Sequence, residues 1–499
     1  MENSKTSLKS KLMYGCGDIF GGGAFLLISL LFLNYLTDVE LMAPAAAGVI
    51  IMIGKAIDAV WDPIMGSISD RTKSKFGRRR LYFLLGIIPI FISFTLIWYS
   101  FGIKSKIALF AYYLIVYVLF NMVFSMVMIP YNSILPEMTK DYKERTSFTG
   151  IRMIFSVTSA IAAGVLPKIL IKSLGGTNIK LGYLIMALIF SALYAIPWLI
   201  VFLGTWENHS SGSLELKERN IFNELKSVFN NKCFKIHAGM FLSGQAAVDF
   251  LTTLFIYYLT VCLNRANEFS MVLGTLLIAQ LISMPIHTKI SQKNTKTAPL
   301  KFGFSVWILA LISSIFLTPQ SPAFLIYIIS GICGLGTSAA VLVPWSILPE
   351  VADVDEMITS KRREGIYSGM ATFLRKMANG LAIGLIGLLL QWIGYVKPQE
   401  IGEAAVQSSL TIYGIKCLFG IVPILFILIA IRFAKKYCIT EEKYAVLMKE
   451  IDRRKNNGEA KGVDENTRKV CEELTGHSYE KLWNSVNSES RINGVTLGG

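Results

Sequence analysis

Long apolar stretches recur along most of the chain, and each is separated from the next by a short polar break. An α-helix needs roughly 20 mainly apolar residues to cross the hydrocarbon core of a bilayer. The pattern therefore predicts an all-α membrane protein with twelve transmembrane helices, and no water-soluble core could hide this much apolar surface. The predicted helices lie at residues 12–36, 44–69, 81–101, 107–136, 148–171, 181–204, 232–262, 269–291, 299–318, 322–348, 365–392 and 408–434.

The twelve helices divide into two groups of six around a hydrophilic segment. We expect an N-terminal six-helix bundle at residues 1–204, a cytoplasmic linker at 205–231, a C-terminal six-helix bundle at 232–435 and a cytoplasmic tail at 436–499. Within the tail, residues 441–456 have the spacing of an amphipathic helix lying along the membrane surface. The polar composition after Asn456 predicts disorder.

A short repeat supports a duplicated bundle. The motif Ile129-Pro-Tyr-Asn-Ser-Ile-Leu-Pro-Glu137 closes the fourth predicted helix, and Val343-Pro-Trp-Ser-Ile-Leu-Pro-Glu350 closes the tenth. Two pseudo-repeat bundles fit the architecture of major facilitator carriers, which bind solute near the bilayer midplane between the halves.

The formal charge of +15 follows from membrane topology. Lys and Arg cluster in the N-terminal segment and the even-numbered connections rather than in one nucleic-acid-binding domain, and such clusters lie on the cytoplasmic side. We therefore predict a multi-pass protein of the cell inner (plasma) membrane with both termini in the cytoplasm. The seven scattered cysteines signal neither a disulfide framework nor a zinc site.

The second predicted helix contains Lys55, Asp58 and Asp62, where lipid tolerates few charges. Spacings of three and four residues place all three on one helical face. Two ionised carboxylates one turn apart repel each other, and a bound Na⁺ or a shared proton relieves that repulsion. Asp58 and Asp62 are therefore candidate ligands of a coupling cation. The alternative is a Lys55–Asp58 ion pair that only locks helices together.

Other charged residues fall inside predicted helices. Arg152 and Lys376 follow the two copies of the repeat, so we expect each half to send one cation inward, facing the aspartates of the second helix. Asp18 in the first helix is a further candidate. Arg375 is expected to snorkel toward the interface, and Asp249 could serve either gating or packing.

The basic loop after the second helix is a candidate cytoplasmic gate. Its residues Gly66, Asp70, Arg71, Gly77 and Arg78 match the spacing of the corresponding loop in major facilitator carriers, where charge pairs hold the inward-closed state. We name Asp70, Arg71 and Arg78 as gating residues, although the cluster could serve only to set topology.

Several motifs together resemble the glycoside-pentoside-hexuronide:cation symporter family, which includes the melibiose carriers. The resemblance implies that Asp58 and Asp62, helped by the Ser125 hydroxyl, coordinate Na⁺, Li⁺ or a proton, and that Arg152 and Lys376 lie beside the sugar and cation sites. The motifs are Tyr14-Gly-Cys-Gly-Asp18, Asp58-Ala-Val-Trp-Asp-Pro63, Ile129-Pro-Tyr-Asn-Ser-Ile-Leu-Pro-Glu137, Arg145-Thr146 and Phe373-Leu-Arg-Lys376.

The chain departs from the melibiose carriers at the sugar clamp. Those carriers hold sugar hydroxyls with an aspartate in the first helix and another in the fourth, and a tryptophan stacks on the sugar. The corresponding positions here are Gly22, Met128 and Asn132. Members of the family that take pentosides or hexuronides also vary at these positions.

A second resemblance points to the animal branch that carries lysophospholipids with Na⁺. It rests on Leu342-Val-Pro-Trp-Ser-Ile-Leu-Pro-Glu-Val351 and Asn267-Glu-Phe269, and the apolar side chains of Phe124, Val127 and Met128 suit an acyl chain. Since the first copy of the repeat has the form usual among microbial sugar-type members, sugars and glycosides come first. The candidate solute-binding residues are Asp18, Gly22, Met128, Asn132, Arg152, Trp345 and Lys376.

These features predict a cation-coupled secondary symporter that works by alternating access as a monomer, with no cofactor and with Na⁺ or H⁺ as the coupling ion. A channel or scramblase would need a continuous polar path, which the paired halves and the gate-like loop argue against. An enzyme would need a nucleophile with a base, or metal ligands within reach, and the sequence contains no such constellation.

Overall fold

The computed structural model describes residues 7–139, 142–176, 178–207, 227–361, 363–398, 405–456 and 463–483, and the regular structure in these ranges is helical. The α-helices are α1 (Leu8–Gly15), α2 (Asp18–Asn34), α3 (Pro44–Arg71), α4 (Arg80–Ile97), α5 (Lys106–Met138), α6 (Tyr142–Gly175), α7 (Ile179–Ala195), α8 (Pro197–Gly204), α10 (Lys232–Tyr257), α11 (Phe269–Lys293), α12 (Ala298–Phe316), α13 (Ala323–Thr359), α14 (Glu364–Trp392), α15 (Ser409–Lys436), α16 (Glu441–Lys455) and α17 (Glu465–Thr475). Short π- and 3₁₀-helices are η1 (Tyr35–Val39), η2 (Val228–Asn230), η3 (Tyr258–Cys262), η4 (Ala266–Glu268) and η5 (Tyr479–Lys481).

Within the described residues, twelve helical stretches are long and apolar enough to cross a membrane, which confirms the predicted all-α fold. Polar side chains cap the first turn of several of them and so fix where they start. These caps are Ser105 before α5, Asn178 before α7, Asn231 before α10 and Ser408 before α15.

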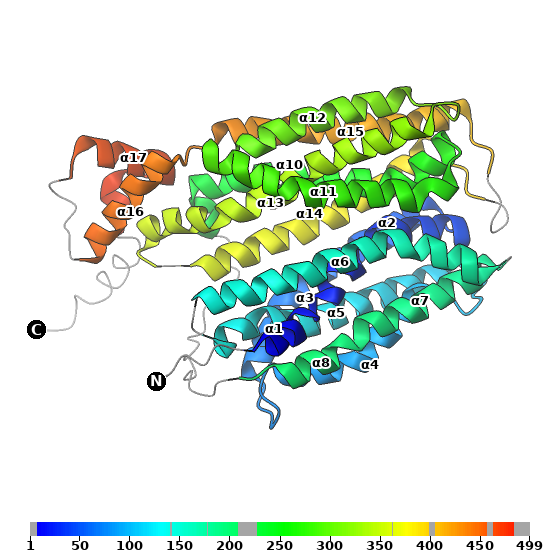
Figure 1. Ribbon diagram of the computed structural model, residues 1–499, viewed down its shortest axis with the longest axis horizontal. Helices are drawn as coiled ribbons and strands as arrows, with labels where there is room; N and C mark the ends of the chain where they lie inside the picture. Colours follow the sequence, from blue (N-terminus) through cyan, green and yellow to red (C-terminus); the bar gives the residue numbers. More distant parts are fainter. Residues whose placement is uncertain are drawn as a thin grey trace, which may run out of the picture.

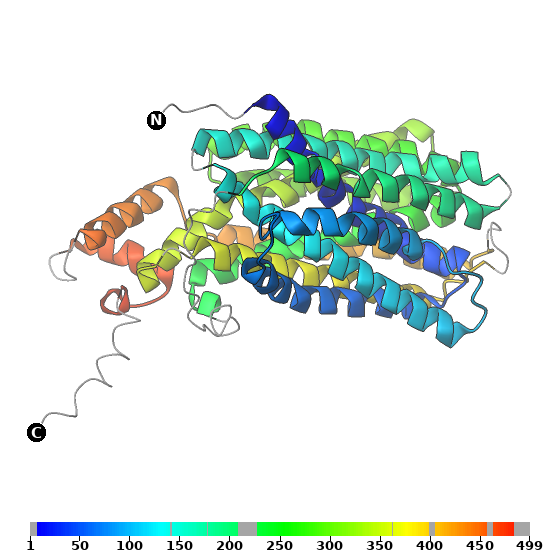
Figure 2. The ribbon, with the colours of Figure 1, turned by 90° about the horizontal axis from the view of Figure 1, so that it is seen from below.

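The helices form two groups that lie side by side along the long axis of the molecule (Figure 1). Helices α1–α8 make the first group and α10–α15 the second, and the groups meet where α3 packs on α14, α6 on α11 and α2 on α10. We call the end of the molecule that carries Leu8, Arg71 and Lys436 the terminal face. The other end, which carries Val39, Pro44 and Trp392, is the opposite face; both views place the tail beyond the terminal face (Figure 2).

The first helices of the two groups end in the same unusual way at the opposite face. Tyr35-Leu-Thr37 and Tyr258-Leu-Thr260 each begin a π-helix, and each π-helix is followed by a residue in the left-handed region, Leu41 with φ 55° and Asn264 with φ 52°. This second repeat was not predicted. Because π-helical turns concentrate at functional sites, it directs attention to the opposite face.

Helix α13 is longer than the predicted tenth helix, which ended at residue 348. It continues to Thr359 through Pro344 and Pro349. A proline removes one backbone donor and frees a carbonyl one turn earlier, and Gln245 Nε2 donates to the freed carbonyl of Ala340 at 3.0 Å. This contact lets the helix pass Pro344 unbroken.

The last turns of α13 anchor the tail. The predicted tail helix is present as α16, and α17 forms where disorder was expected, so that expectation is wrong for Glu465–Thr475. Apolar side chains of both helices are buried against the end of α13, which explains the added order. They include Leu447, Ile451, Val470, Cys471 and Leu474. The remaining stretches of the expected disorder, 457–462 and 484–499, lie outside the described residues.

Candidate functional site

Helix α3 places its two aspartates where the two helix groups meet. Asp58 is fully buried and Asp62 is largely buried. Lys376 of α14 reaches across from the second group, and its Nζ lies 3.0 Å from Asp58 Oδ2 and 2.6 Å from Asp62 Oδ2. The spacing of four residues puts both carboxylates on the same side of α3, so one ammonium contacts both.

Ser125 of α5 contacts the same two carboxylates from the other side. Its Oγ lies 3.0 Å from Asp58 Oδ1 and also hydrogen-bonds Asp62 Oδ1. A hydroxyl carries a single proton, so it can donate to only one carboxylate at a time. The other close oxygen pair therefore needs a proton or a cation to be stable.

The second cation of α3, Lys55, is held away from the centre of this cluster. Its Nζ donates to Asn121 Oδ1 at 3.3 Å, lies 3.3 Å from the centre of the Phe25 ring, and is 3.7 Å from Asp58 Oδ2. The Lys55–Asp58 ion pair considered from the sequence is present, but it is the longer of the two contacts that Asp58 makes with an ammonium.

Asp58 Oδ2 is buried, and its close partner is the Lys376 ammonium at 3.0 Å. Without that partner, or a cation in its place, a charged oxygen would be buried uncompensated, which is costly. Two carboxylates and a hydroxyl within reach form the hard-oxygen ligand set that Na⁺ or a proton prefers. We name Asp58, Asp62, Ser125 and Lys376 the cation cluster.

Glycines let α3 and α14 approach closely enough to form the cation cluster. A Cβ at Gly48 would lie 2.8 Å from the Gly384 carbonyl oxygen, and one at Gly387 would lie 2.5 Å from the Pro44 carbonyl oxygen. Close backbone approach at small residues is typical of helix pairs in membranes. The same contact between α3 and α14 continues toward the terminal face. There Gly380 packs against Lys55, and Lys376 follows one turn earlier on α14.

Arg152 does not face the aspartates of α3, which corrects the expectation from the sequence. Its guanidinium pairs with Asp18 at 3.1 Å and lies over the Tyr131 ring, 4.8 Å from its centre. Met128 lies close to Asp18, because a Cβ at Gly21 would meet both side chains. Met128 is therefore next to the Asp18–Arg152 pair. The charge of Arg152 is therefore balanced inside the first group.

The other predicted solute-binding residues are more scattered. Gly22 packs against Ser156, since a Cβ there would lie 2.5 Å from the Ser156 carbonyl oxygen. Asn132 is exposed, and Trp345 is 44% exposed with its ring edge on Phe241. Asp18, Gly22, Met128 and Arg152 are thus neighbours, whereas no contact between described residues joins Asn132 or Trp345 to them.

The predicted gating loop folds back on its own group. Arg78 and Arg79 both pair with Glu137, the last residue of the first repeat copy, with Arg79 Nη1 2.7 Å from Glu137 Oε1. The Glu207 carboxylate accepts the backbone N–H groups of Arg78, Arg79 and Arg80 at 2.8–2.9 Å. Asp70 and Arg71 end α3, and their side chains lie outside the described part of the structure.

Arg375 is not a snorkelling residue. It forms a bidentate pair with Asp249 of α10, with both N–O distances at 2.7 Å, and Asn379 Nδ2 donates to the same carboxylate at 2.9 Å. Asp249, whose role the sequence left open, therefore pairs with the half-buried guanidinium of Arg375. The adjacent Lys376 points in another direction, because successive residues of a helix are rotated by about 100°.

At the opposite face, side chains from both groups are joined by hydrogen bonds. Thr37 and Tyr257 hydroxyls are 3.0 Å apart, and Tyr395 Oη donates to Asp38 at 2.8 Å. Lys397 donates to the Leu41 carbonyl. Ala45–Gln391 and Lys172–Asn267 add two more hydrogen bonds between the groups at this face, and Lys376 joins the groups at the cation cluster. The sequence analysis missed this cluster, although the repeated Tyr-Leu-Thr could have signalled it.

Residues 13–441 match the family described as MFS/sugar transport protein. The chain belongs to this family. The match takes in every predicted transmembrane helix, the cation cluster and the polar contacts at the opposite face.

Two relatives of this transporter are described as symporters. An uncharacterized symporter of Synechocystis is 26% identical over 537 aligned positions, which cover 91% of this chain and 98% of the relative. The sodium-dependent lysophosphatidylcholine symporter 1 of Gallus gallus is 26% identical over 474 positions, covering 88% of each chain. The transporter is therefore a secondary active symporter and not an enzyme.

A solved structure has the same fold. The crystal structure of a bacterial homolog of the human lysosomal transporter Spinster, in an inward-facing and unoccupied conformation, superposes with a TM-score of 0.61 at 15% identity and covers 88% of this chain and 97% of that one. The transporter thus has the major facilitator fold and is a multi-pass membrane protein.

Proposed function

We propose that this transporter couples the inward movement of Na⁺ or H⁺ to the import of a sugar, glycoside or related small organic solute. The observation that carries the proposal is the contact of Lys376 with both Asp58 and Asp62 across the two helix groups. The formal charges of Asp58, Asp62, Lys376 and Lys55 sum to zero, so the cation cluster and Lys55 together are neutral before a coupling cation arrives.

Cation binding has a direct consequence for this cluster. A Na⁺ or proton that takes oxygens of Asp58 and Asp62 competes with the Lys376 ammonium for the same atoms. The competition loosens the charge contact between the two groups and frees Lys376 to meet the solute. Coupling requires that the cation and the solute each strengthen the binding of the other, and this exchange supplies such a link.

Alternating access requires the two groups to rock against each other around the central site. Hydrogen bonds at the opposite face and the ion pairs of Lys376 join the two groups. We infer that the opposite face is closed in this arrangement. Because Lys- and Arg-rich connections lie on the terminal face and such connections favour the cytoplasmic side, we propose that this face is cytoplasmic, with the protein in the inner (plasma) membrane and both termini inside.

The sequence motifs around Asp58 and Glu137 support a place among the glycoside-pentoside-hexuronide:cation symporters, with a sugar-type solute. A lysophospholipid is the second candidate. It is favoured by the buried, apolar Met128, where a sugar clamp would need a carboxylate, by the buried Phe124 on the same helix, and by the name of the Gallus gallus relative.

The test is solute-dependent Na⁺ or H⁺ uptake into proteoliposomes. The panel contains glycosides, uronic acids and lysophosphatidylcholine, and the variants are Asp58→Asn with Asp62→Asn. We expect coupled uptake of one solute class by the wild type and a loss of at least about 100-fold in the variant, since removing the partners of a buried ammonium costs about 3 kcal/mol or more.

Glu268→Gln is the matched control, because Glu268 pairs with Arg265 at the opposite face at 2.8 Å and makes no contact with the cation cluster. Coupled uptake that persists in the double variant would rule out the cation cluster. Uptake of solute with no accompanying cation would rule out symport.

A further inference from the structure

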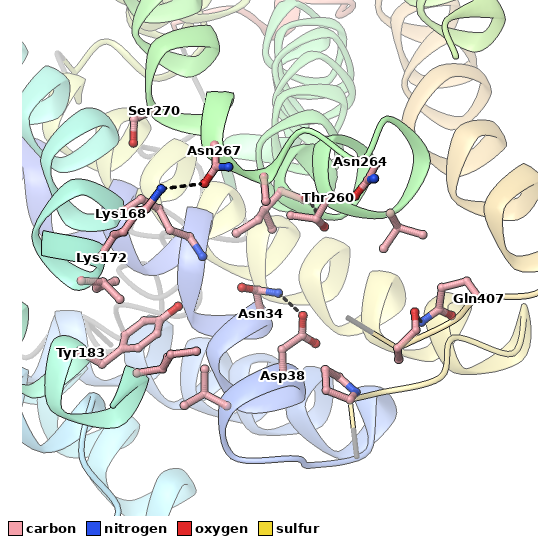
Figure 3. A pocket seen from close by; sticks show the side chains of 18 of the residues that line it. Asn34, Asp38, Lys168, Lys172, Tyr183, Thr260, Asn264, Asn267, Ser270 and Gln407 are labelled. Atoms are coloured by element: carbon pink, nitrogen blue, oxygen red, sulfur yellow. Dashed lines mark hydrogen bonds between the residues drawn. The ribbon is translucent and has the colours of Figure 1, made fainter. Parts of the chain in front are cut away.

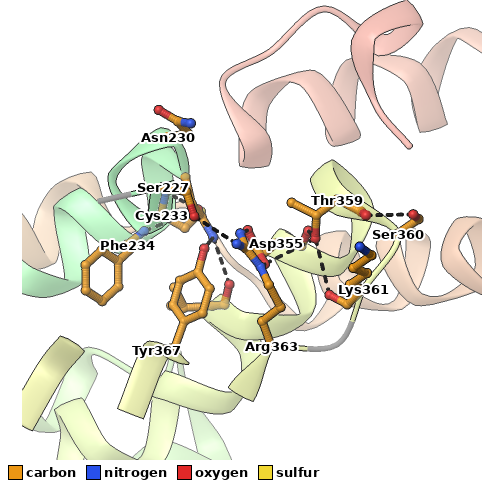
Figure 4. A network of polar contacts seen from close by, with 12 residues as sticks. Ser227, Asn230, Cys233, Phe234, Asp355, Thr359, Ser360, Lys361, Arg363 and Tyr367 are labelled. Atoms are coloured by element: carbon orange, nitrogen blue, oxygen red, sulfur yellow. Dashed lines mark hydrogen bonds and ion pairs between the residues drawn. The ribbon is translucent and has the colours of Figure 1, made fainter. Parts of the chain in front are cut away.

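A pocket of about 850 Å³ lies at the opposite face, between α6 of the first group and α11 of the second (Figure 3). Its lining includes Lys168 and Lys172 of α6 and the two π-helical ends near Asp38 and Thr260. Lys168 lies 16 residues beyond Arg152 on α6, which is about 24 Å along the helix axis. The pocket is therefore separate from the Asp18–Arg152 pair, and no residue of the cation cluster lines it.

The two lysines supply positive charge to this pocket. They are one helical turn apart, so they share a face of α6. Lys172 Nζ donates to Asn267 Oδ1 at 3.1 Å. Lys168 makes no hydrogen bond or ion pair with any described residue, and Figure 3 shows its side chain reaching into the same space. Its ammonium is available to a ligand.

The one carboxylate among the described lining residues, Asp38, interacts electrostatically with Lys168 but forms no ion pair with it. It accepts hydrogen bonds from Asn34 Nδ2 at 2.6 Å, Thr37 Oγ1 at 2.7 Å and Tyr395 Oη at 2.8 Å. A carboxylate with three donors is well satisfied. Two cations therefore face one carboxylate that is already bonded, and the pocket has an excess of positive charge.

Neutral donors lie beside the lysines. Because Asn267 Oδ1 accepts from Lys172, its Nδ2 is left to donate into the pocket. Asn264, held by its positive φ of 52°, is a second side-chain amide in the lining. Ammonium groups together with amide N–H groups form the donor set that binds phosphate or carboxylate oxygens.

The mouth of the pocket is apolar. Ile169 of α6 and Met271 of α11 line it, are 46% and 63% exposed, and lie within candidate membrane spans. Exposed apolar side chains at this depth face acyl chains, while the lysines stand near the helix ends, where headgroups lie. An ammonium group at headgroup depth can pair with the oxygens of an anionic lipid headgroup.

We propose that this pocket binds the anionic headgroup of a membrane amphiphile, a phosphate or a carboxylate, with its acyl chain lying along Ile169 and Met271. Lys168 is the principal contact, and Lys172, Asn264 and Asn267 complete the site. The proposal goes beyond the proposed symport, because it uses none of the residues of the cation cluster.

The experiment measures binding to the purified full-length protein by microscale thermophoresis. The probes are oleoyl lysophosphatidic acid, oleate, inorganic phosphate and neutral monooleoylglycerol. We expect the two anionic amphiphiles to bind at least about tenfold more tightly than either inorganic phosphate or monooleoylglycerol. Lys168→Gln should weaken the anionic amphiphiles by about tenfold, and Lys168→Arg should keep most of the affinity.

Lys104→Gln is the control, since Lys104 is an exposed lysine at the same face and does not line the pocket. Equal binding of monooleoylglycerol and lysophosphatidic acid, or an unchanged affinity in Lys168→Gln, would overturn the proposal. Inorganic phosphate binding as tightly as the amphiphiles would overturn the lipid assignment in favour of a free anion. Asp58→Asn should bind the amphiphiles as the wild type does, so a failure of symport and a failure of this site can be told apart.

Discussion

The two helix groups share one architecture but differ in where their charges point. In the first group, α3 carries Asp58 and Asp62 to the contact between the groups, whereas α11, which packs at the corresponding place in the second group, has no Asp or Glu between Phe269 and Lys293. The second group contributes one cation to this contact, Lys376. A duplicated scaffold thus holds an asymmetric site: one half supplies the carboxylates that bind a cation, and the other supplies the charge that the cation replaces.

The comparison is sharpest at two neighbouring residues of α14. Lys376 contacts carboxylates of the first group, and Arg375 contacts Asp249 of its own group. We expect Lys376→Gln to reduce coupled uptake by about 100-fold, since about 3 kcal/mol of charge pairing is lost, with a smaller change in thermal stability. Cation-driven uptake in proteoliposomes is the measurement.

Arg375→Gln is the matched variant. It should lower thermal stability strongly and coupled uptake less. Leaving Asp249 buried with only Asn379 as a partner costs about 3 kcal/mol of stability, so the unfolding temperature in detergent should fall well below that of Lys376→Gln. If both variants lose uptake and stability equally, the division of roles between the two residues is wrong.

The close contact between α3 and α14 near the opposite face gives the next largest expected effect. Gly387→Val places a side chain against the Pro44 carbonyl and the Gly48 backbone, so it must push the two groups apart. We expect transport to fall by about tenfold, as overpacking of this kind costs 1–3 kcal/mol. Gly369→Val on the same helix is the control, because a Cβ there meets nothing within 4 Å. Equal effects of the two substitutions on uptake would refute the close approach.

The repeated motif offers a smaller test of the two halves. Each copy ends in a glutamate that pairs with the connection after the second membrane helix of its own group. Glu137 binds Arg78 and Arg79. Glu350 binds Lys296 and accepts a hydrogen bond from Tyr437 Oη at 3.3 Å. The side chain of Lys296 is 44% exposed, so water screens its pair. Glu137→Gln should therefore destabilise the protein by about 2 kcal/mol and Glu350→Gln by about 1 kcal/mol, measured as shifts in thermal unfolding. The reverse order would contradict this reading.

The tail helices α16 and α17 pack on the second group's side of the comparison, through the end of α13. A change of pH should alter their stability, and this is the smallest effect that we expect. Burial acts to raise the pKa of Glu450, but hydrogen bonds from Arg453, Tyr479 and Arg454 outweigh it and hold the pKa below its usual 4.5. A lowered pKa adds stability above pH 4.5, and this stability is lost as the pH falls through the folded-state pKa.

Packing of α16 and α17 should accordingly loosen by at most about 1 kcal/mol in acid. Hydrogen exchange of their amides, corrected for intrinsic rates, measures the change between pH 6 and pH 3, a range that extends below the usual pKa of 4.5. Glu450→Gln should remove the pH dependence, and an unchanged profile in that variant would assign the effect to another group.

The sequence predicted the cation cluster well because its signal is local. Asp58 and Asp62 stand four residues apart in an apolar helix, and the Ser125 and Lys376 positions came from a resemblance over short motifs. It failed for Arg152 and Arg375, and it left the role of Asp249 open. Each of these is an isolated charge whose partner lies on another helix, so its pairing depends on how the helices are rotated and which helices are neighbours.

What the sequence determined by itself was the number of membrane helices, their bounds to within a few residues at most ends, the duplicated plan and the helical face that carries the aspartates. Hydrophobic length and helical periodicity fix these, and both are properties of one segment at a time. Only the tertiary structure decided that Lys376 rather than Arg152 meets Asp58, that the tail helices pack on α13, and that Lys168 and Asp38 share a pocket. Those outcomes depend on packing between segments far apart in the chain, where a rotation of about 100° between adjacent residues changes the partner of a charge.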